Sequence, residues 1–314
     1  VELSNTLNRS QTLNNIQLGD VKETNSFAYA SLDYNINKWS IIPGLRVDNF
    51  NFNYVDELQT AYTNLSASKT VFSPKLNFLY RENEDLQFFL KSGIGFHSND
   101  TRVIVAQTGE DILPAAYGSD LGTIWRPFSK LLVNAAAWYL YLEQEFVYVG
   151  DAGIVEPSGK TERFGLDLGL RYQLTDWLFF NTDATLTKAR SLEEANGNDY
   201  IPLAPKFTMA GGLSVLDLGR FSGGLRYRFI DDRPANEDNS IVAEGYFVTD
   251  FNANYQISKN LNIGMSIENL LDTEWNETQF ATESRLENEA ISVEEIHFIP
   301  GTPLFIKANL SFTF

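Results

Sequence analysis

Residues 304–314, LFIKANLSFTF, decide the fold because their side chains alternate between apolar and polar. The apolar set is Leu304, Ile306, Ala308, Leu310, Phe312 and Phe314, and the polar set is Lys307, Asn309, Ser311 and Thr313, with Phe305 as the exception. A period of two places one face of a β-strand in an apolar medium and the other in water. A tilted strand of about 9–11 residues crosses a bilayer. An edge strand of a soluble sandwich has the same pattern, so the other strands must decide.

The amino-acid composition excludes some classes of protein. The chain has 314 residues, 41 acidic against 24 basic side chains, a net charge of -17 and no cysteine. This negative charge argues against nucleic acid as a partner, because phosphate binding needs clustered Lys and Arg. The longest apolar runs fall short of the 18 or so residues of a membrane helix, which excludes a helical membrane protein. A β-barrel remains possible, since lumen-facing residues dilute its lipid-facing ones.

The alternation recurs along the chain. It is clearest in residues 163–173, 221–230, 247–257 and 261–268, where apolar residues oppose Gly, Asn, Asp and Arg. Weaker versions bring the total to roughly a dozen or more strands, most of them longer than the usual 5–6 residues of globular proteins. No stretch has a helical period. The sequence therefore predicts an all-β protein.

The connections between these strands differ in length in a regular way. Short turns fall near residues 37–38, 82–84, 127–130, 175–176, 217–220 and 258–260. Long polar connections fall at residues 56–69, 98–118, 149–161, 191–205, 231–244 and 272–302. The two kinds alternate, so short turns gather at one end of the strands and long loops at the other. This asymmetry is typical of transmembrane barrels, whereas a soluble sandwich mixes its loop lengths. We therefore predict an antiparallel transmembrane β-barrel.

Several motifs resemble those of one family. Residues 262–275, NIGMSIENLLDTEW, resemble the near-C-terminal signature of TonB-dependent outer-membrane receptors, in which Asn269, Leu270 and Asp272 form a turn and Trp275 follows. Further stretches that are similar to the family are PGLRVD (43–48), GFHSND (95–100), EFVYVGDAGIVEPSG (145–159) and IPGTP (299–303). Their order and spacing extend the resemblance over nearly the whole chain. In such barrels the assembly machinery reads a terminal aromatic, a role that the resemblance assigns to Phe314, Phe312 and Leu310.

The resemblance also implies what this chain lacks. Such receptors have a barrel of about 22 strands, closed by an N-terminal plug domain that an inner-membrane energy-coupling protein grips. Here about 13–14 strands and no plug are recognisable. We expect residues 1–314 to be a single domain, the C-terminal portion of the barrel, without the plug and the first strands. A sheet edge in lipid leaves backbone groups unpaired. Either residues 1–8 add a strand to close a smaller barrel, or missing strands complete it, which we favour.

The function implied by the resemblance is energised uptake of a scarce nutrient, most often a ferric siderophore or other metal complex, across the outer membrane of a Gram-negative bacterium. It needs no catalytic residue and no cofactor. Expected partners are outer-membrane lipid and lipopolysaccharide, the barrel-assembly machinery, the energy-coupling protein acting through the missing plug, and a small-molecule or metal-complex ligand. Two alternatives stay open: a passive outer-membrane porin or channel, and a secreted β-rich glycan-binding or adhesin module.

Candidate ligand contacts lie in two long loops. One loop contains His97, Asn99, Asp100 and Arg102, and the other contains Asp231, Asp232 and Arg233. The competing interpretation of both is a solvated acidic loop. The spacing of acidic residues at 231–238 matches no defined calcium loop, so we predict no metal site. The chain contains no GxSxG, HExxH or phosphate-binding glycine motif, and we expect no enzyme activity.

Overall fold

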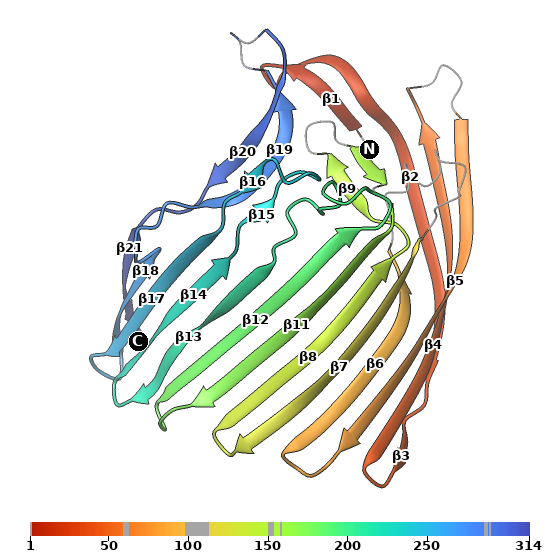
Figure 1. The fold of residues 1–314 in the computed structure, drawn as a ribbon. Helices are drawn as coiled ribbons and strands as arrows, with labels where there is room; N and C mark the ends of the chain where they lie inside the picture. Colours follow the sequence, from red (N-terminus) through yellow and green to blue (C-terminus); the bar gives the residue numbers. More distant parts are fainter. Residues whose placement is uncertain are drawn as a thin grey trace. The chain divides into compact units, whose positions relative to one another are not determined.

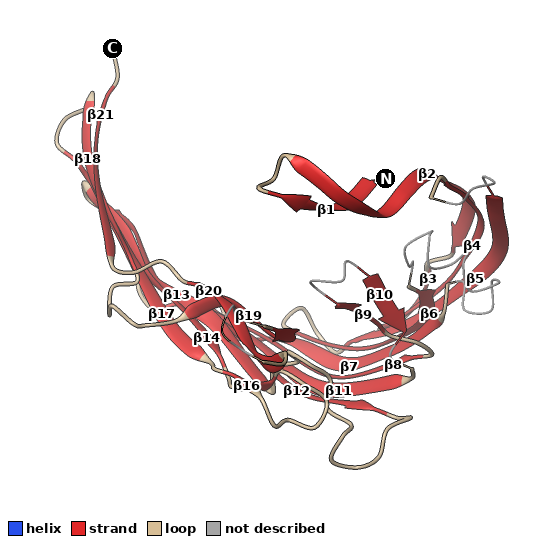
Figure 2. Cartoon of the chain, turned by 90° about the horizontal axis from the view of Figure 1, so that it is seen from above, coloured by secondary structure: helices blue, strands red, loops and turns tan. Residues whose placement is uncertain are grey.

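The computed structural model describes residues 2–58, 63–97, 113–149, 154–157, 159–285, 288 and 290–314. Every regular element within these ranges is a β-strand, as the colouring in Figure 2 shows. The described residues accordingly contain no helix with the length and apolar character needed to span a membrane. The all-β prediction is confirmed.

The strands are longer than those of most globular proteins. Their bounds are β1 (Glu2–Leu7), β2 (Gln11–Ser31), β3 (Tyr34–Ile36), β4 (Trp39–Asp56), β5 (Thr63–Arg81), β6 (Leu86–Phe96), β7 (Ala115–Phe128), β8 (Leu131–Leu142), β9 (Phe146–Val149), β10 (Ile154–Pro157), β11 (Thr161–Gln173), β12 (Leu178–Ser191), β13 (Phe207–Leu218), β14 (Phe221–Ile230), β15 (Arg233–Pro234), β16 (Val242–Ala243), β17 (Tyr246–Gln256), β18 (Leu261–Glu268), β19 (Asn276–Ser284), β20 (Val293–Pro300) and β21 (Phe305–Phe312).

The main sheet is an antiparallel meander in which chain neighbours are sheet neighbours (Figure 1). Its order is β1-β2-β4-β5-β6-β7-β8-β11-β12-β13-β14-β17-β18-β21, with β3 paired to β4. The pairs β9/β10, β15/β16 and β19/β20 form separate two-stranded sheets inserted between main strands. Tight turns join alternate strands of the meander, which confirms the predicted antiparallel topology.

The chain divides into two compact units. The first consists of Val1–Phe78, Lys91–Ser119 and Leu140–Thr161. Its core contains Phe50 and Phe52, whose stacked rings have centroids 5.6 Å apart, and the ring of Phe96 meets Phe50 edge-on at 5.4 Å. The carboxylate of Asp48 is fully buried beside this core and pairs with Arg46 at 2.8 Å. The buried charge is tolerated because it is paired and hydrogen-bonded.

The second unit consists of Leu79–Leu90, Asp120–Tyr139 and Glu162–Phe314, and its sheet has two chemically different faces. One, which we call the apolar face, carries Leu166 on β11 and Leu186 on β12, which are 56% and 51% exposed although both strands lie inside the sheet. The opposite polar face carries Arg171 and Asp183 from the same two strands. Large exposed apolar faces are rare in soluble monomers and typical of the lipid-facing side of a barrel.

Three long connections differ from their prediction as plain polar loops, and the first of them, residues 149–161, contains β10 paired with β9. Residues 231–244 contain the hairpin β15/β16, and residues 272–302 contain the longer hairpin β19/β20, which pairs Thr278 with Ile299 and Ser284 with Val293. The sequence pattern did not reveal these hairpins, because β15 and β16 are only two residues long and the exposed Phe298 and Ile299 of β20 are adjacent, which breaks the two-residue alternation. The main sheet also contains β1, which pairs with β2. Residues near the N-terminus therefore add a strand, but β1 and β21 end the described strand order and do not pair with each other, so this strand does not close a smaller barrel.

Candidate functional site

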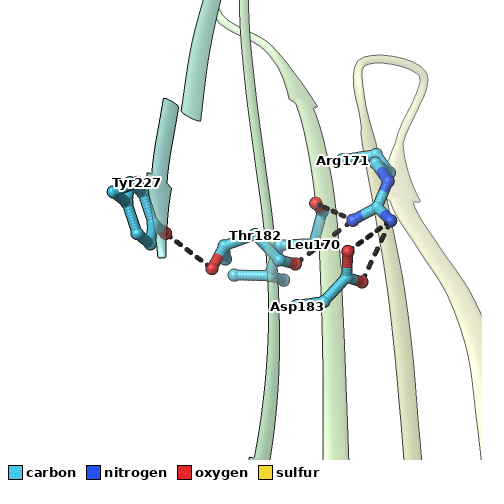
Figure 3. Close-up of polar contacts among 5 residues, drawn as sticks. All are labelled: Leu170, Arg171, Thr182, Asp183 and Tyr227. Atoms are coloured by element: carbon cyan, nitrogen blue, oxygen red, sulfur yellow. Dashed lines mark hydrogen bonds and ion pairs between the residues drawn. The ribbon is translucent and has the colours of Figure 1, made fainter. Parts of the chain in front are cut away.

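Cross-strand ion pairs occupy the polar face of the second unit. Both carboxylate oxygens of Asp183 accept hydrogen bonds from Nη2 of Arg171, at 2.9 and 2.8 Å (Figure 3). Farther along the sheet, Nη2 of Arg228 lies 3.7 Å from Oδ2 of Asp250. These pairs are half exposed, so each stabilises the fold only slightly. Their importance is that they make this face suited to water, as the lumen of a barrel requires.

A polar cavity of about 460 Å³ lies where β14, β17 and β18 approach the long loops. Its charged lining consists of Arg226, Arg228, Asp250, Glu268 and Glu277. Arg226 and Asp250 face each other directly in the β14/β17 register. A volume of this size accepts a small ligand or one part of a larger one. Guanidinium groups in such a cavity can donate paired hydrogen bonds to anionic oxygens.

Trp275 forms an aromatic wall of this cavity. Its Nε1 donates a hydrogen bond of 3.0 Å to the carbonyl oxygen of Thr302, and its ring centroid lies 4.8 Å from that of Tyr246. The guanidinium carbon of Arg228 lies 5.3 Å from the Trp275 ring, which is a cation–π distance. A Cβ atom at Gly301 would come within 2.1 Å of the same ring, so the indole needs a glycine there. These contacts hold the wall in one position.

The family-like turn after β18 is a hydrogen-bonded anchor centred on Asn269, which is 1% exposed. Its Nδ2 donates to the carbonyl oxygens of Thr273 at 2.8 Å and Thr302 at 3.1 Å, and its Oδ1 accepts from the Thr273 amide at 2.9 Å. Its own backbone N–H donates to Oδ1 of Asp250 at 3.0 Å. One side chain thus joins the turn to a residue 33 positions later in the chain.

Leu270 and Asp272, the other members of the turn, form further hydrogen bonds to neighbouring segments. The backbone N–H of Leu270 donates to the carbonyl oxygen of Thr249 at 2.7 Å, and Oδ1 of Asp272 accepts from the Leu304 amide at 3.2 Å. Asn269 and Asp272 have φ angles of 50° and 51°, a left-handed conformation that Asn and Asp tolerate better than most residues. The turn therefore fixes β17, β18 and the entry to β21 beside the cavity.

The predicted loop residues Asp231, Asp232 and Arg233 lie together at the base of the β15/β16 hairpin. Oδ1 of Asp232 accepts a hydrogen bond of 2.7 Å from the Gly245 amide, which closes the loop. Arg233 is only 7% exposed, and its Nη1 has no hydrogen-bond partner among the described residues. Burial lowers the pKa of Arg233, and the nearby Tyr246 and Asp232 oppose this shift. A buried guanidinium donor without a partner is costly unless something else binds it.

The other predicted loop is described only at its start. His97 follows β6, and its backbone N–H donates to the carbonyl oxygen of Pro114 at 3.1 Å. Asn99, Asp100 and Arg102 lie outside the described residues. His97 belongs to the first unit and the triplet at 231–233 to the second. Within the described part of the chain, no group of three His, Cys, Asp or Glu residues is placed to hold a metal ion.

The C-terminal strand forms as predicted. β21 pairs with β18, so that Phe312 lies opposite Leu261 and Leu310 opposite Ile263. Phe314 is fully exposed, and its ring meets Phe312 edge-on with centroids 5.2 Å apart. The end of the chain thus presents two adjacent aromatic rings. Their use in assembly stays a prediction.

Sequence reasoning identified most parts of the cavity separately but did not join them. Arg226, Arg228 and Asp250 lie in the alternating segments 221–230 and 247–257, among the residues that oppose the apolar ones, and Trp275 is part of the motif 262–275. Glu277 was missed, since it lies on β19 within a segment predicted to be loop. The cavity could have been predicted from one feature of the sequence, which is that charged residues gather at the strand ends that lead into long loops.

Comparisons with known proteins agree with this architecture. Residues 3–270 match the family described as "TonB dependent receptor-like, beta-barrel". The curated catecholate siderophore receptor Fiu of Escherichia coli (strain K12) is 26% identical over 169 residues, which cover 50% of this chain and 22% of that receptor. The shared segment is thus less than a quarter of that relative.

Solved structures give a similar result. The closed form of the ferric-catecholate import receptor Fiu from K12 E. coli has a TM-score of 0.72 at 17% identity, over 94% of this chain and 45% of that one. The unliganded ferric citrate transporter FecA has a TM-score of 0.71 at 18% identity, over 93% and 46%. The siderophore receptor PiuA from Acinetobacter baumannii has a TM-score of 0.73 at 15% identity, over 93% and 44%. At these identities the likeness concerns the fold, and the chain spans less than half of each structure.

Proposed function

Because the chain belongs to the TonB dependent receptor-like β-barrel family, we propose that it forms part of an outer-membrane receptor that imports a metal complex into a Gram-negative bacterium. The family consists of receptors and not of enzymes. The favoured ligand is a ferric siderophore, and uptake is driven by energy relayed from the inner membrane. On this proposal residues 1–314 are a single domain, the C-terminal portion of the barrel, and segments outside this sequence supply the remaining strands and the plug.

The observation that carries the proposal is the contrast between the two faces of β11 and β12. Leu166 and Leu186 are 56% and 51% exposed on one face, while the Arg171–Asp183 pair occupies the other. Apolar area in water costs about 25 cal/mol per Å², which lipid contact removes. Charged pairs in lipid are costly, which a water-filled lumen avoids. A sheet between lipid and an aqueous channel satisfies both faces.

The ligand class is supported by the cavity and by the names of the relatives. Arg226 and Arg228 provide donors for the anionic oxygens of a ferric catecholate or carboxylate complex, and Trp275 provides an apolar wall. The unpartnered Nη1 of Arg233 is a further donor within the same loop region. Among the similar proteins are receptors named for catecholate siderophores and ferric citrate, and the copper transporter OprC. Asp231, Asp232 and Arg233, with the loop of His97, Asn99, Asp100 and Arg102, remain proposed contacts.

The proposal also assigns partners. The energy-coupling protein acts through the plug, and the assembly machinery reads the C-terminal strand with Phe312 and Phe314. Lipid and lipopolysaccharide surround the apolar face. These assignments rest on family membership and on the exposed aromatic terminus.

Uptake by the native gene product that contains this chain tests the proposal. Cells that lack other iron receptors are supplied with radiolabelled ferric catecholate, ferric citrate or copper, with and without collapse of the proton gradient. We expect uptake of at least one metal complex and its loss when the gradient collapses. Uptake that persists without the gradient indicates a passive channel, and absence of uptake for every complex contradicts a metal receptor.

A further inference from the structure

Two short hairpins of the second unit, β15/β16 and β19/β20, lie outside the main sheet and next to each other (Figure 1). Hairpin β15/β16 carries Arg233, one of the proposed ligand contacts, and hairpin β19/β20 begins directly after Trp275, the aromatic wall of the polar cavity. An isolated two-stranded hairpin is at best marginally stable in water. The contact between the two hairpins therefore decides how precisely these parts of the site are held.

This contact is made by the side chain of Gln279 on β19, which is 3% exposed. Its Oε1 accepts a hydrogen bond of 3.1 Å from the Glu244 amide, and its Nε2 donates one of 2.8 Å to the Glu244 carbonyl oxygen. A side-chain amide has a donor and an acceptor, as a peptide group has, so Gln279 bonds to this main chain as a neighbouring strand would. Among the described residues of segments 231–245 and 276–300, these are the only hydrogen bonds that join the two hairpins.

Gln279 lies two residues beyond Glu277, which lines the cavity. The β19/β20 register shifts between Asn276 and Thr278, so Glu277 is the extra residue of a β-bulge. A bulge turns a side chain away from the regular alternation, and here the carboxylate reaches the cavity. The position of this carboxylate thus depends on where the start of β19 is held.

The residue that Gln279 bonds to follows a hairpin that is itself fixed. Ala243, directly before Glu244, is fully buried. On the other strand of this hairpin, the Pro234 carbonyl oxygen accepts a hydrogen bond of 2.7 Å from the Leu203 amide in the preceding long connection. Gln279 therefore ties β19 to a segment that is already bound on its other side.

We propose that Gln279 is a positioning residue of the ligand site, which holds the cavity wall of Trp275 and Glu277 against the hairpin that carries Arg233. Both of its bonds go to main-chain atoms, so the exposed side chain of Glu244 takes no part in the contact. A site whose parts are already in place binds more tightly, because the apparent dissociation constant rises as the fraction of molecules in the competent arrangement falls. The inference rests on the proposed function in that the cavity binds a metal complex.

Distance and binding measurements on the full receptor that contains this chain test the role of Gln279. This sequence has no cysteine, so Val242→Cys and Glu294→Cys place one spin label on each hairpin. Pulsed electron paramagnetic resonance then gives the distribution of distances between the labels. Binding of a ferric catecholate, ferric citrate and copper is measured by tryptophan fluorescence, and the uptake rate of each is measured in cells. Gln279→Met removes both hydrogen bonds at similar side-chain size.

Asn236→Leu is the matched control. Asn236 is also a buried amide with two hydrogen bonds, but both stay within its own loop. Its Nδ2 donates to Oγ of Ser240 at 2.8 Å, and its Oδ1 accepts from the Ile241 amide at 3.1 Å. Gln279→Glu keeps the acceptor and loses the donor, which provides a second variant if methionine prevents folding. Heat-modifiable migration checks that each variant is folded.

We expect Gln279→Met to broaden the distance distribution and to weaken binding of the transported complex about tenfold, as a competent fraction of about one tenth requires. The KM for uptake rises with it, while the maximal rate at saturation stays the same. Gln279→Glu changes the distances and the binding in the same direction, and Asn236→Leu leaves both unchanged.

An unchanged distance distribution in both Gln279 variants overturns the proposal. An equal effect of Asn236→Leu overturns it as well, because a general loss of stability then explains the result. A lowered maximal rate with unchanged binding also contradicts a positioning role. If the wild type binds none of the three complexes, the proposed function fails, and the distance distributions alone decide whether Gln279 holds the hairpins together.

Discussion

The hydroxyl of Tyr227 on β14 donates a hydrogen bond of 2.7 Å to Oγ1 of Thr182 on β12, although β13 lies between these strands (Figure 3). Gly211 makes this contact possible. It is the β13 residue that pairs with both Thr182 and Tyr227, and without a side chain it lets the tyrosine ring cross above the backbone. The bond ties three consecutive strands together on the apolar face.

Substitution of Gly211 by alanine should destabilise the second unit. The new Cβ would lie 2.3 Å from the Asn181 carbonyl oxygen and 2.7 Å from the Tyr227 hydroxyl, so the backbone and the ring must both move. We expect a loss of about 1–3 kcal/mol, measured by urea unfolding of the folded protein in detergent. Gly118→Ala is the control, because nothing lies within 4 Å of its Cβ. Equal stability of the two variants would contradict the packing role of Gly211.

The turn at Asn269 should depend on its side-chain amide. Asn269→Ala removes three hydrogen bonds, so the carbonyl oxygen and the amide of Thr273 lose their side-chain partner, while the Thr302 carbonyl oxygen keeps its bond from Nε1 of Trp275. We expect a loss of about 3 kcal/mol or more in urea unfolding, because unsatisfied buried groups cost about 1–3 kcal/mol each.

Asn269→Gly separates this effect from backbone conformation. Glycine adopts the left-handed φ of 50° at residue 269 without strain but cannot form the side-chain bonds. If the glycine variant is as stable as the wild type, conformation and not hydrogen bonding explains the role of the asparagine.

Removal of Arg228 should weaken ligand binding without unfolding the protein. Arg228→Gln takes a guanidinium from the cavity lining, and its half-exposed pairing with Asp250 adds little to stability. We expect about tenfold weaker binding of the ferric complex, since a hydrogen bond to a charged group contributes about 1.5–3 kcal/mol. Arg171→Gln is the matched control, because Arg171 also pairs with an aspartate on the polar face but does not line the cavity. An equal loss in both variants argues for a general charge effect.

The loop carboxylate of Asp238 should titrate below the ordinary aspartate range. Hydrogen bonds of 2.7 Å from the Ser240 hydroxyl and 2.9 Å from its amide lower the pKa of Asp238, because they stabilise the ionised form. Their contribution is complete above the ordinary pKa of about 3.9 and is lost as pH falls through the lowered value. The stabilising contribution of these hydrogen bonds to the loop is therefore expected to stay constant between neutral pH and about pH 4.

Carbon NMR of labelled aspartate carboxyl groups measures whether the pKa of Asp238 is lowered. The variant Asp238→Asn assigns the resonance. Ser240→Ala removes the larger cause, so the pKa of Asp238 should rise toward its ordinary value. A wild-type midpoint at or above about 3.9 is the contrary result.

The aromatic terminus should matter for assembly and not for binding. Phe314 is fully exposed and contacts the ring of Phe312, so its removal costs the fold little. Deletion of Phe314 from the native gene product is expected to reduce the amount of folded barrel in the outer membrane several-fold, measured by heat-modifiable migration. Protein that does reach the membrane should bind ligand normally. Unchanged membrane levels would contradict the assembly role.

Much of the fold was predictable from local patterns. The alternation at residues 304–314 identified β21, and the short polar turn at 258–260 identified the connection between β17 and β18. The hairpin β19/β20 and the strand β1 were not predicted. Neither β1 nor β20 has a regular alternation of apolar and polar residues. Such strands form because partner strands satisfy their backbone groups, which a single-strand pattern does not reveal.

The candidate site was predictable only in pieces. The sequence by itself determined that the protein is all-β, that each strand has an apolar and a polar side, and which residues belong to each. Only the tertiary structure decided that Asn269 bonds to Thr302, that Trp275 faces Arg228, and that Tyr227 reaches Thr182 over Gly211. The physical reason is that side-chain direction follows from the two-residue period of one strand, whereas register and loop docking depend on contacts between distant segments.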